Sequence, residues 1–156
     1  MGLILKLKKG EHLIVNGALI RFETASKIVL KTKSAVMHDR QIMRPEEVTT
    51  PGARIYFAIQ NAYMAEEGES ATYVEQARAR IVDFRQASGL STVHETLDHI
   101  TGFLENTDYF QALQLTRQLL EFEAALLDMA DAGTPTDLDI QDEFQAEESA
   151  ELEKVQ

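Results

Sequence analysis

Basic side chains are the residues of this chain whose type and distribution most clearly point to a chemistry. Residues 1–54 contain ten Lys or Arg and five acidic residues, whereas residues 55–156 contain five basic and 21 acidic residues. The formal net charge of −11 therefore conceals a basic amino-terminal segment on an acidic chain. Positive groups gathered in one segment attract polyanions, and an acidic remainder limits how widely that segment binds. The pattern predicts a basic module with a polyanionic partner.

No sequence motif indicates catalytic activity. The sequence has no phosphate-binding glycine loop, no nucleophile elbow and no HExxH zinc motif. His94 and His99 fall on different sides of a helix, and their i,i+4 partners Asp98 and Glu95 are typical of helical surface pairs. The chain contains no Cys, which excludes disulfides and thiolate metal ligands. We expect no catalytic residue, no metal site and no cofactor.

Alternating apolar and polar residues predict β-strands in the first 44 residues. Segment 3–7 places leucines on one side and Ile4 and Lys6 on the other, and segment 27–31 alternates in the same way. Residues 34–37 predict a further short strand. The amino-terminal module is therefore expected to be an antiparallel β structure.

A β-hairpin is predicted around Asn16-Gly17. These two residues tolerate the positive φ angles of a type I′ turn, and β-forming segments flank them at 12–15 and 18–22. A two-residue loop fixes the register of the hairpin. The expected pairs are Val15 with Ala18, Leu13 with Ile20, and His12 with Arg21.

Four amphipathic helices are predicted after the strands. Thr50 and Pro51 are suitable as the cap and first residue of the first helix, and Thr92 with Glu95 predicts a capping box at the third. Apolar residues recur at helical spacing throughout this half of the chain, and helices of this kind pack their apolar stripes against each other. The predicted helices span residues 52–64, 71–87, 92–105 and 108–130.

The helical spacing of apolar residues ends at Asp131, and acidic residues dominate the sequence after it. Such a composition is typical of a disordered tail, and a helix induced by a partner at 138–153 is the alternative. The predicted fold is therefore α+β: an N-terminal antiparallel β module of hairpins, a bundle of about four α-helices, and a disordered acidic C-terminal tail. The expected boundaries are a basic β module at 1–50, a helical region packed on it at 51–130, and the tail at 131–156.

The chain is expected to be cytoplasmic. No stretch approaches the roughly 18 apolar residues that a membrane span requires, and the short apolar start is followed by basic residues, the reverse of a signal peptide. The absence of Cys is compatible with a reducing compartment. We therefore expect no membrane partner, and the oligomeric state stays undetermined.

The strand lysines have two interpretations. If the strands share one sheet with one buried face, the basic residues gather on the other face and form a phosphate-binding surface. Alternatively, they are solvated side chains, and lysine at a sheet edge prevents aggregation. The aromatic residues Phe22, Tyr56 and Phe57 could stack on unpaired bases, but their positions favour packing inside the protein.

Three strings resemble one known family, the FlbT family of flagellin regulators from flagellated alphaproteobacteria. They are LKLKKGEHLIVNGALI at 5–20, IMRPEEVTTPGARIYFAIQNAY at 42–63 and YFQALQLTRQLLEFE at 109–123. The likeness covers most of residues 3–128, and the middle string is the most specific because no generic fold dictates its order. The tail beyond about residue 131 carries no family signal.

The resemblance implies a post-transcriptional regulator that acts on the 5′ untranslated region of flagellin mRNA and changes its stability or translation. Its partners would be the flagellin mRNA leader and possible FlaF-type protein or flagellin. The alternative is a chaperone-like flagellar assembly factor with indirect effects on mRNA. The resemblance supplies no contact residues, so we assign RNA contact from charge alone. The assigned residues are Lys6, Lys8, Lys9, Arg21, Lys27, Lys31, Lys33, Arg40 and Arg44.

Overall fold

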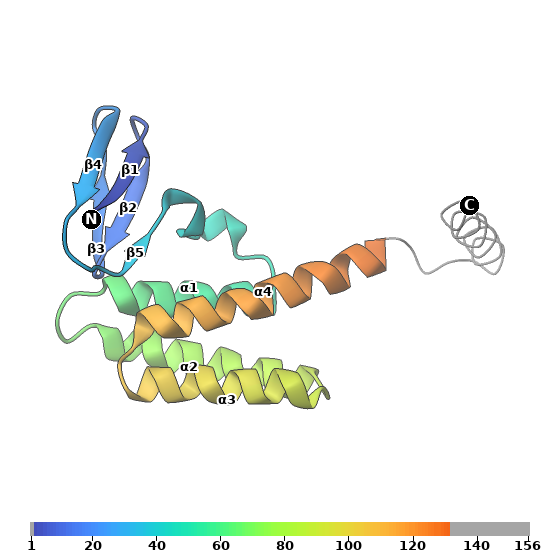
Figure 1. Cartoon of the computed structure of the whole chain (residues 1–156). Helices are drawn as coiled ribbons and strands as arrows, with labels where there is room; N and C mark the ends of the chain where they lie inside the picture. The colour runs from blue at the N-terminus through green and yellow to red at the C-terminus, as the bar shows by residue number, and fades with distance from the viewer. Residues whose placement is uncertain (1, 132–156) are drawn as a thin grey trace, which may run out of the picture. The chain divides into compact units, whose positions relative to one another are not determined.

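A computed structural model describes residues 2–131 (Figure 1). The chain separates into two compact units, residues 1–120 and residues 121–156, each of which is considered by itself. The first unit begins with β1 (Leu3–Leu7), β2 (His12–Val15), β3 (Ala18–Arg21), β4 (Ser26–Leu30) and β5 (Val36–Met37). Two 3-10 helices follow, η1 (Asp39–Gln41) and η2 (Pro45–Glu47). The α-helices are α1 (Pro51–Met64), α2 (Ser70–Ala87), α3 (Ser91–Glu105) and α4 (Tyr109–Asp131), the last of which continues into the second unit.

The predicted α+β class is confirmed, with antiparallel strands first and four helices after them. The predicted acidic tail lies outside the described residues. The predicted domain boundaries at 50 and 130 stay predictions.

The strands form two small antiparallel sheets, not one. β1 pairs with β4, and β2 pairs with both β3 and β5. Their inner faces share a cluster built on Leu5, Leu7 and Leu13, of which Leu13 is completely buried. Half-buried residues from both sheets surround this cluster, and they are Val15, Phe22, Ile28, Leu30 and Val36. The prediction that Phe22 packs in the core is confirmed.

The β2–β3 hairpin has the predicted turn and register. Asn16 and Gly17 have φ angles of 49° and 85°, the two positive values that a type I′ turn needs. The pairs His12–Arg21, Leu13–Ile20 and Val15–Ala18 all form as expected. The Asn16 side-chain carbonyl accepts a hydrogen bond from the backbone N–H of Ala35 at 2.9 Å, which joins the turn to the start of β5.

Polar side chains attach the linker after β5 to α1. The buried Gln60 side chain accepts from the Met43 N–H at 2.7 Å and donates to the Met43 carbonyl at 2.9 Å. The Tyr56 hydroxyl donates to the Gln41 carbonyl at 2.6 Å. These bonds satisfy the N–H and carbonyl of Met43 and the carbonyl of Gln41, which lie outside regular secondary structure. They therefore hold the segment of η1 and η2 against α1.

The helices begin and end close to their predicted bounds, with one error of capping. Thr50 caps α1 as expected, since its hydroxyl accepts from the Ala53 N–H at 3.1 Å. The expected capping box of Thr92 and Glu95 is wrong, because α3 begins at Ser91 and its N-cap is Leu90, which has no capping side chain.

Apolar stripes of the helices account for most of the remaining core. In α3 the apolar residues that recur at helical spacing are all buried, and they are Val93, Leu97, Ile100 and Leu104. In α4, Leu113 and Thr116 are completely buried, and the Thr116 hydroxyl is satisfied by the Ala112 carbonyl at 2.7 Å. Leu127, which the spacing assigns to the same stripe, is half exposed in the second unit.

Candidate functional site

The outer face of the β1–β4 pair carries the clearest cationic arrangement of the molecule. Leu5 and Leu7 point into the core, so the alternation of β1 turns Ile4 and Lys6 outward. In the register of the two strands, Ile4 is opposite Val29 and Lys6 is opposite Lys27. All four side chains are exposed. We call these residues, Ile4, Lys6, Lys27 and Val29, the β1–β4 face.

Like charges directly opposite each other destabilise a strand pair. Lys6 and Lys27 are in this arrangement, and within residues 2–131 neither forms an ion pair that would compensate it. The lysines that flank the two strands are also exposed and without ion pairs in the same range, and they are Lys8, Lys9, Lys31 and Lys33. An anion bound at this face would relieve the repulsion between the paired lysines.

The three arginines assigned to RNA contact lie elsewhere. The condition of one shared sheet is not met, because β1 pairs with β4 while Arg21 lies on β3 in the other sheet. Arg44 lies in the linker, where its guanidinium is 3.8 Å from the Asp39 carboxylate. Arg40 lies in η1 and lines a cavity of about 180 Å³ together with Tyr56 and Arg117. The charge pattern identified exposed cations but could not assign them to separate sheets.

Asp39 places a negative charge beside His12 of β2 and Arg44 of the linker. Its carboxylate accepts a hydrogen bond from the His12 N–H at 2.7 Å and lies 3.8 Å from the His12 Nδ1. The same carboxylate pairs with Arg44. This part of the surface therefore has an internal counter-charge, in contrast with the lysines of β1 and β4.

A polar pair that the sequence did not indicate joins the buried Tyr56 to the half-buried Arg117. The Tyr56 hydroxyl accepts from the Arg117 Nε at 3.3 Å, and the guanidinium lies 5.9 Å from the centre of the tyrosine ring. A second guanidinium nitrogen donates to Gln114 at 3.0 Å, while the third is buried without a partner in the described part of the chain. Burial raises the pKa of Tyr56, and the arginine opposes this shift.

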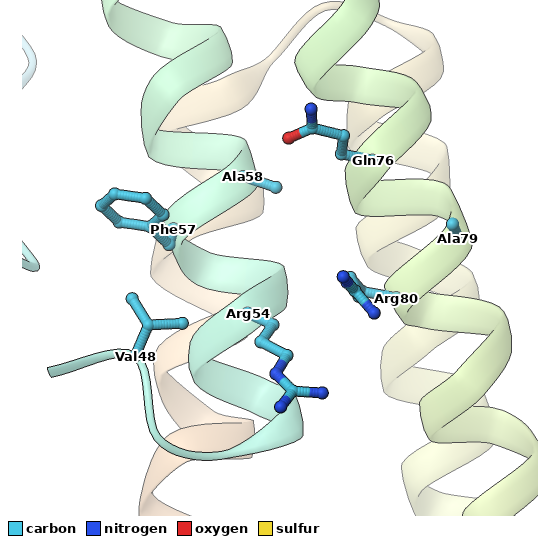
Figure 2. Close-up of a pocket in the computed structure, with 7 residues that line it drawn as sticks. All are labelled: Val48, Arg54, Phe57, Ala58, Gln76, Ala79 and Arg80. Atoms are coloured by element: carbon cyan, nitrogen blue, oxygen red, sulfur yellow. The ribbon is translucent and has the colours of Figure 1, made fainter. Parts of the chain in front are cut away.

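A groove of about 480 Å³ lies over α1 and α2 (Figure 2). Its walls combine an apolar part with two arginines and an amide. The lining residues are Val48, Arg54, Phe57, Ala58, Gln76, Ala79 and Arg80. Figure 2 shows the side chains of Gln76 and Arg80 directed from α2 toward α1, with Arg54 at the same gap and Phe57 and Val48 on the other side of α1.

The histidines and acidic residues do not assemble a metal site in the part of the chain that the structure describes. His94 has a structural role: its Nε2 donates to the Ser88 carbonyl at 2.6 Å and lies 3.2 Å from the Arg85 carbonyl, at the end of α2. Asp98, the expected partner of His94, pairs with Arg85 instead. Among the described helices, none is long and apolar enough to cross a membrane.

Comparison with known proteins places this architecture in one family. Residues 3–127 match the family described as "Flagellar protein FlbT". A "Flagellum biosynthesis repressor protein FlbT" of Caulobacter vibrioides is 33% identical over 134 residues, which cover 85% of this chain and 94% of the relative.

More distant relatives agree with this match. A "Probable flagellum biosynthesis repressor protein FlbT" of Brucella ovis is 26% identical over 126 residues, covering 79% of this chain and 80% of the relative. A comparison with solved structures found no match. The matched region includes every strand and helix of the first unit, and the chain therefore belongs to the FlbT family of flagellar proteins.

Proposed function

We propose that this protein represses flagellum biosynthesis after transcription, by binding the 5′ untranslated region of flagellin mRNA and changing its stability or translation. The names of its relatives support the regulatory part, since they are described as flagellum biosynthesis repressors. Such a regulator acts by binding, without catalysis, in the cytoplasm. The RNA-binding part rests on the surface of the β module.

The observation that carries the proposal is the pairing of Lys6 with Lys27 on an exposed strand face. The protein sustains a repulsion there that a phosphate backbone would relieve, and further unpaired lysines flank the same strands. Lysine contacts to phosphate supply affinity and position the RNA on the protein, but they do not distinguish one base from another. The β1–β4 face therefore holds the RNA backbone in this proposal.

The acidic helix α3 disfavours RNA contact at its own surface. It contains three acidic residues and no Lys or Arg. Its negative potential repels RNA. A protein with a basic surface on all sides would bind any polyanion, whereas a single basic face limits non-specific association.

Charge reversal tests the assignment. The triple variant Lys6→Glu, Lys8→Glu, Lys31→Glu is compared with the charge-preserving triple variant in which the same residues become Arg. Both are titrated with a flagellin leader RNA at ~100 mM salt, where phosphate contacts are strong. We expect the Glu variant to lose at least about tenfold in affinity and the Arg variant to bind like wild type. Equal binding by all three proteins would refute the assigned face.

A second candidate function is docking of a protein partner, such as flagellin or a FlaF-type protein. It is favoured by the last turns of α4, where Leu126, Leu127 and Met129 are 48%, 50% and 73% exposed. Neighbouring exposed apolar side chains are typical of an interaction site. Co-purification of wild type and of a Leu126→Ser, Leu127→Ser variant with each protein tests this role, and equal capture of the two forms would contradict it.

A further inference from the structure

We propose that the groove over α1 and α2 binds one unpaired nucleotide of an RNA strand, with the phosphate held between Arg54 and Arg80. This inference rests on the proposed RNA-binding function and adds what the lysines of the β1–β4 face do not supply, a place where a base can be held. The argument depends on the shape of the groove, on its charge and on the chemistry of its lining residues.

The size of the groove suits a nucleotide. Its volume of about 480 Å³ lies within the range of small-ligand pockets, which runs from roughly 300 to 1,000 Å³. Arg54 and Arg80 come from the two neighbouring helices and lie at the same gap (Figure 2). A guanidinium presents several N–H donors in a planar fork that matches phosphate oxygens, so two of them at one gap form a suitable phosphate clamp.

The charge of α1 favours an anion near Arg54. α1 contains no acidic residue, and Arg54 occupies its amino-terminal turns, where the helix dipole is positive and a cation is unfavourable. Arg54 forms no ion pair within residues 2–131. Arg80 is partly neutralised by Asp83, whose carboxylate is 3.6 Å away in an exposed pair. Such exposed pairs contribute little, so the Arg80 guanidinium remains available to a ligand.

The remaining lining residues favour a nucleotide over an acidic peptide. Ala58 and Ala79 add apolar atoms to the groove for the body of a base, and Phe57 extends the apolar lining from the other side of α1 (Figure 2). The Gln76 side chain offers a donor and an acceptor, the groups that base edges require, and has no hydrogen-bond partner among the described residues. A carboxylate side chain would use the arginines and leave the amide unused.

The test uses the full chain and two ligands. Wild type, Arg54→Gln, Arg80→Gln and the control Arg78→Gln are titrated with a flagellin leader RNA and with each 5′-mononucleotide. Arg78 is a matched control because it lies on α2, loses the same charge and does not line the groove. We expect Arg54→Gln and Arg80→Gln to weaken mononucleotide binding about tenfold and leader binding several-fold, with Arg78→Gln close to wild type.

The outcomes separate this inference from the function on which it rests. The lysine variants could lose leader binding while Arg54→Gln and Arg80→Gln bind the leader like wild type. This result would overturn the nucleotide site in the groove and retain the proposed function. If wild type did not bind the leader RNA, the proposed function would be overturned. The mononucleotide titration would still show whether the groove binds a nucleotide. A poly-glutamate peptide that displaces mononucleotide from wild type at lower concentration than the leader RNA does would show a protein-docking site instead.

Discussion

Lys6 lies directly opposite Lys27 in the antiparallel pair of β1 and β4, on the face that points away from the core. A folding-only account does not explain this choice, because a lysine facing a carboxylate would stabilise the same strands. The arrangement is explained if the pair has a ligand of opposite charge. The fold and the proposed function therefore make opposite demands on these two positions.

Replacing Lys27 by Glu is expected to separate these demands. The variant converts a repulsive cross-strand pair into an attractive one and should raise the free energy of unfolding by about 0.2–1 kcal/mol. It should at the same time weaken leader RNA binding. Urea denaturation and RNA titration measure the two effects, and Lys33→Glu is the stability control, since Lys33 lies outside the strand ladder. Reduced stability of Lys27→Glu would contradict the electrostatic interpretation.

Salt dependence should report the number of lysines that contact phosphate. For a single strand, the logarithm of the binding constant falls with the logarithm of salt by about 0.7 for each neutralised phosphate. Replacement of Lys6, Lys27 and Lys31 by Gln should therefore reduce the slope by about 2. Filter binding between ~50 and ~300 mM salt provides the measurement. An unchanged slope with lower affinity would show that these lysines act through the fold.

Much of the β module could be predicted because its signals are local. Asn16-Gly17 specified both the turn and the register of β2 and β3. Alternation in 3–7 identified Leu5 and Leu7 as core residues, although Leu3 on the same side is half exposed. The partner of β1 could not be predicted, since alternation reveals the buried side of a strand but not its neighbour. For this reason the charge pattern assigns Arg21 and Lys6 to one set of RNA contacts, although the two residues lie on different sheets.

The groove and the polar pair of Tyr56 with Arg117 could not be predicted from the sequence, for a related reason. Each joins residues from different helices, and neither helix alone carries a sign of the contact. The role of His94 also depends on a neighbour, because its ring closes the end of α2 from a position on α3. Helical spacing identified most buried residues of the helices, with Leu127 as an exception, but it did not identify which helices pack together.

Gly17 should tolerate substitution less well than Gly10, although both have positive φ angles of 85° and 86°. The tip of the hairpin approaches the end of α1, and a Cβ added at Gly17 would lie 2.8 Å from the Tyr63 carbonyl oxygen. A Cβ at Gly10 meets nothing within 4 Å. We expect Gly10→Ala to cost about 1–2 kcal/mol from backbone conformation alone, and Gly17→Ala to cost more. Equal losses in thermal or urea unfolding would contradict the contact.

Tyr56 should make stability fall at alkaline pH. Burial raises the pKa of its hydroxyl above the ordinary value of 10.0 in the folded protein. The unfolded chain then loses its proton first, so stability is complete below about pH 10 and decreases as pH rises beyond it. Tyr56→Phe should reduce this decrease without abolishing it, because burial also raises the pKa of Tyr63.

The same variant should lower stability at neutral pH by about 1–3 kcal/mol, because it leaves the Gln41 carbonyl and the Arg117 Nε without their partner. Urea unfolding at pH 7 and at pH 10.5 or so compares the two proteins. Parallel pH profiles for wild type and Tyr56→Phe would contradict the assignment.

The most direct test of the central claim is an amide NMR titration of the full-length protein with a flagellin leader RNA. If the β1–β4 face holds the RNA backbone, the largest and most salt-sensitive shifts will occur at Lys6, Lys27 and their strand neighbours, while α3 stays unchanged. Shifts confined to α3 and α4, or none at all at saturating RNA, would contradict the claim.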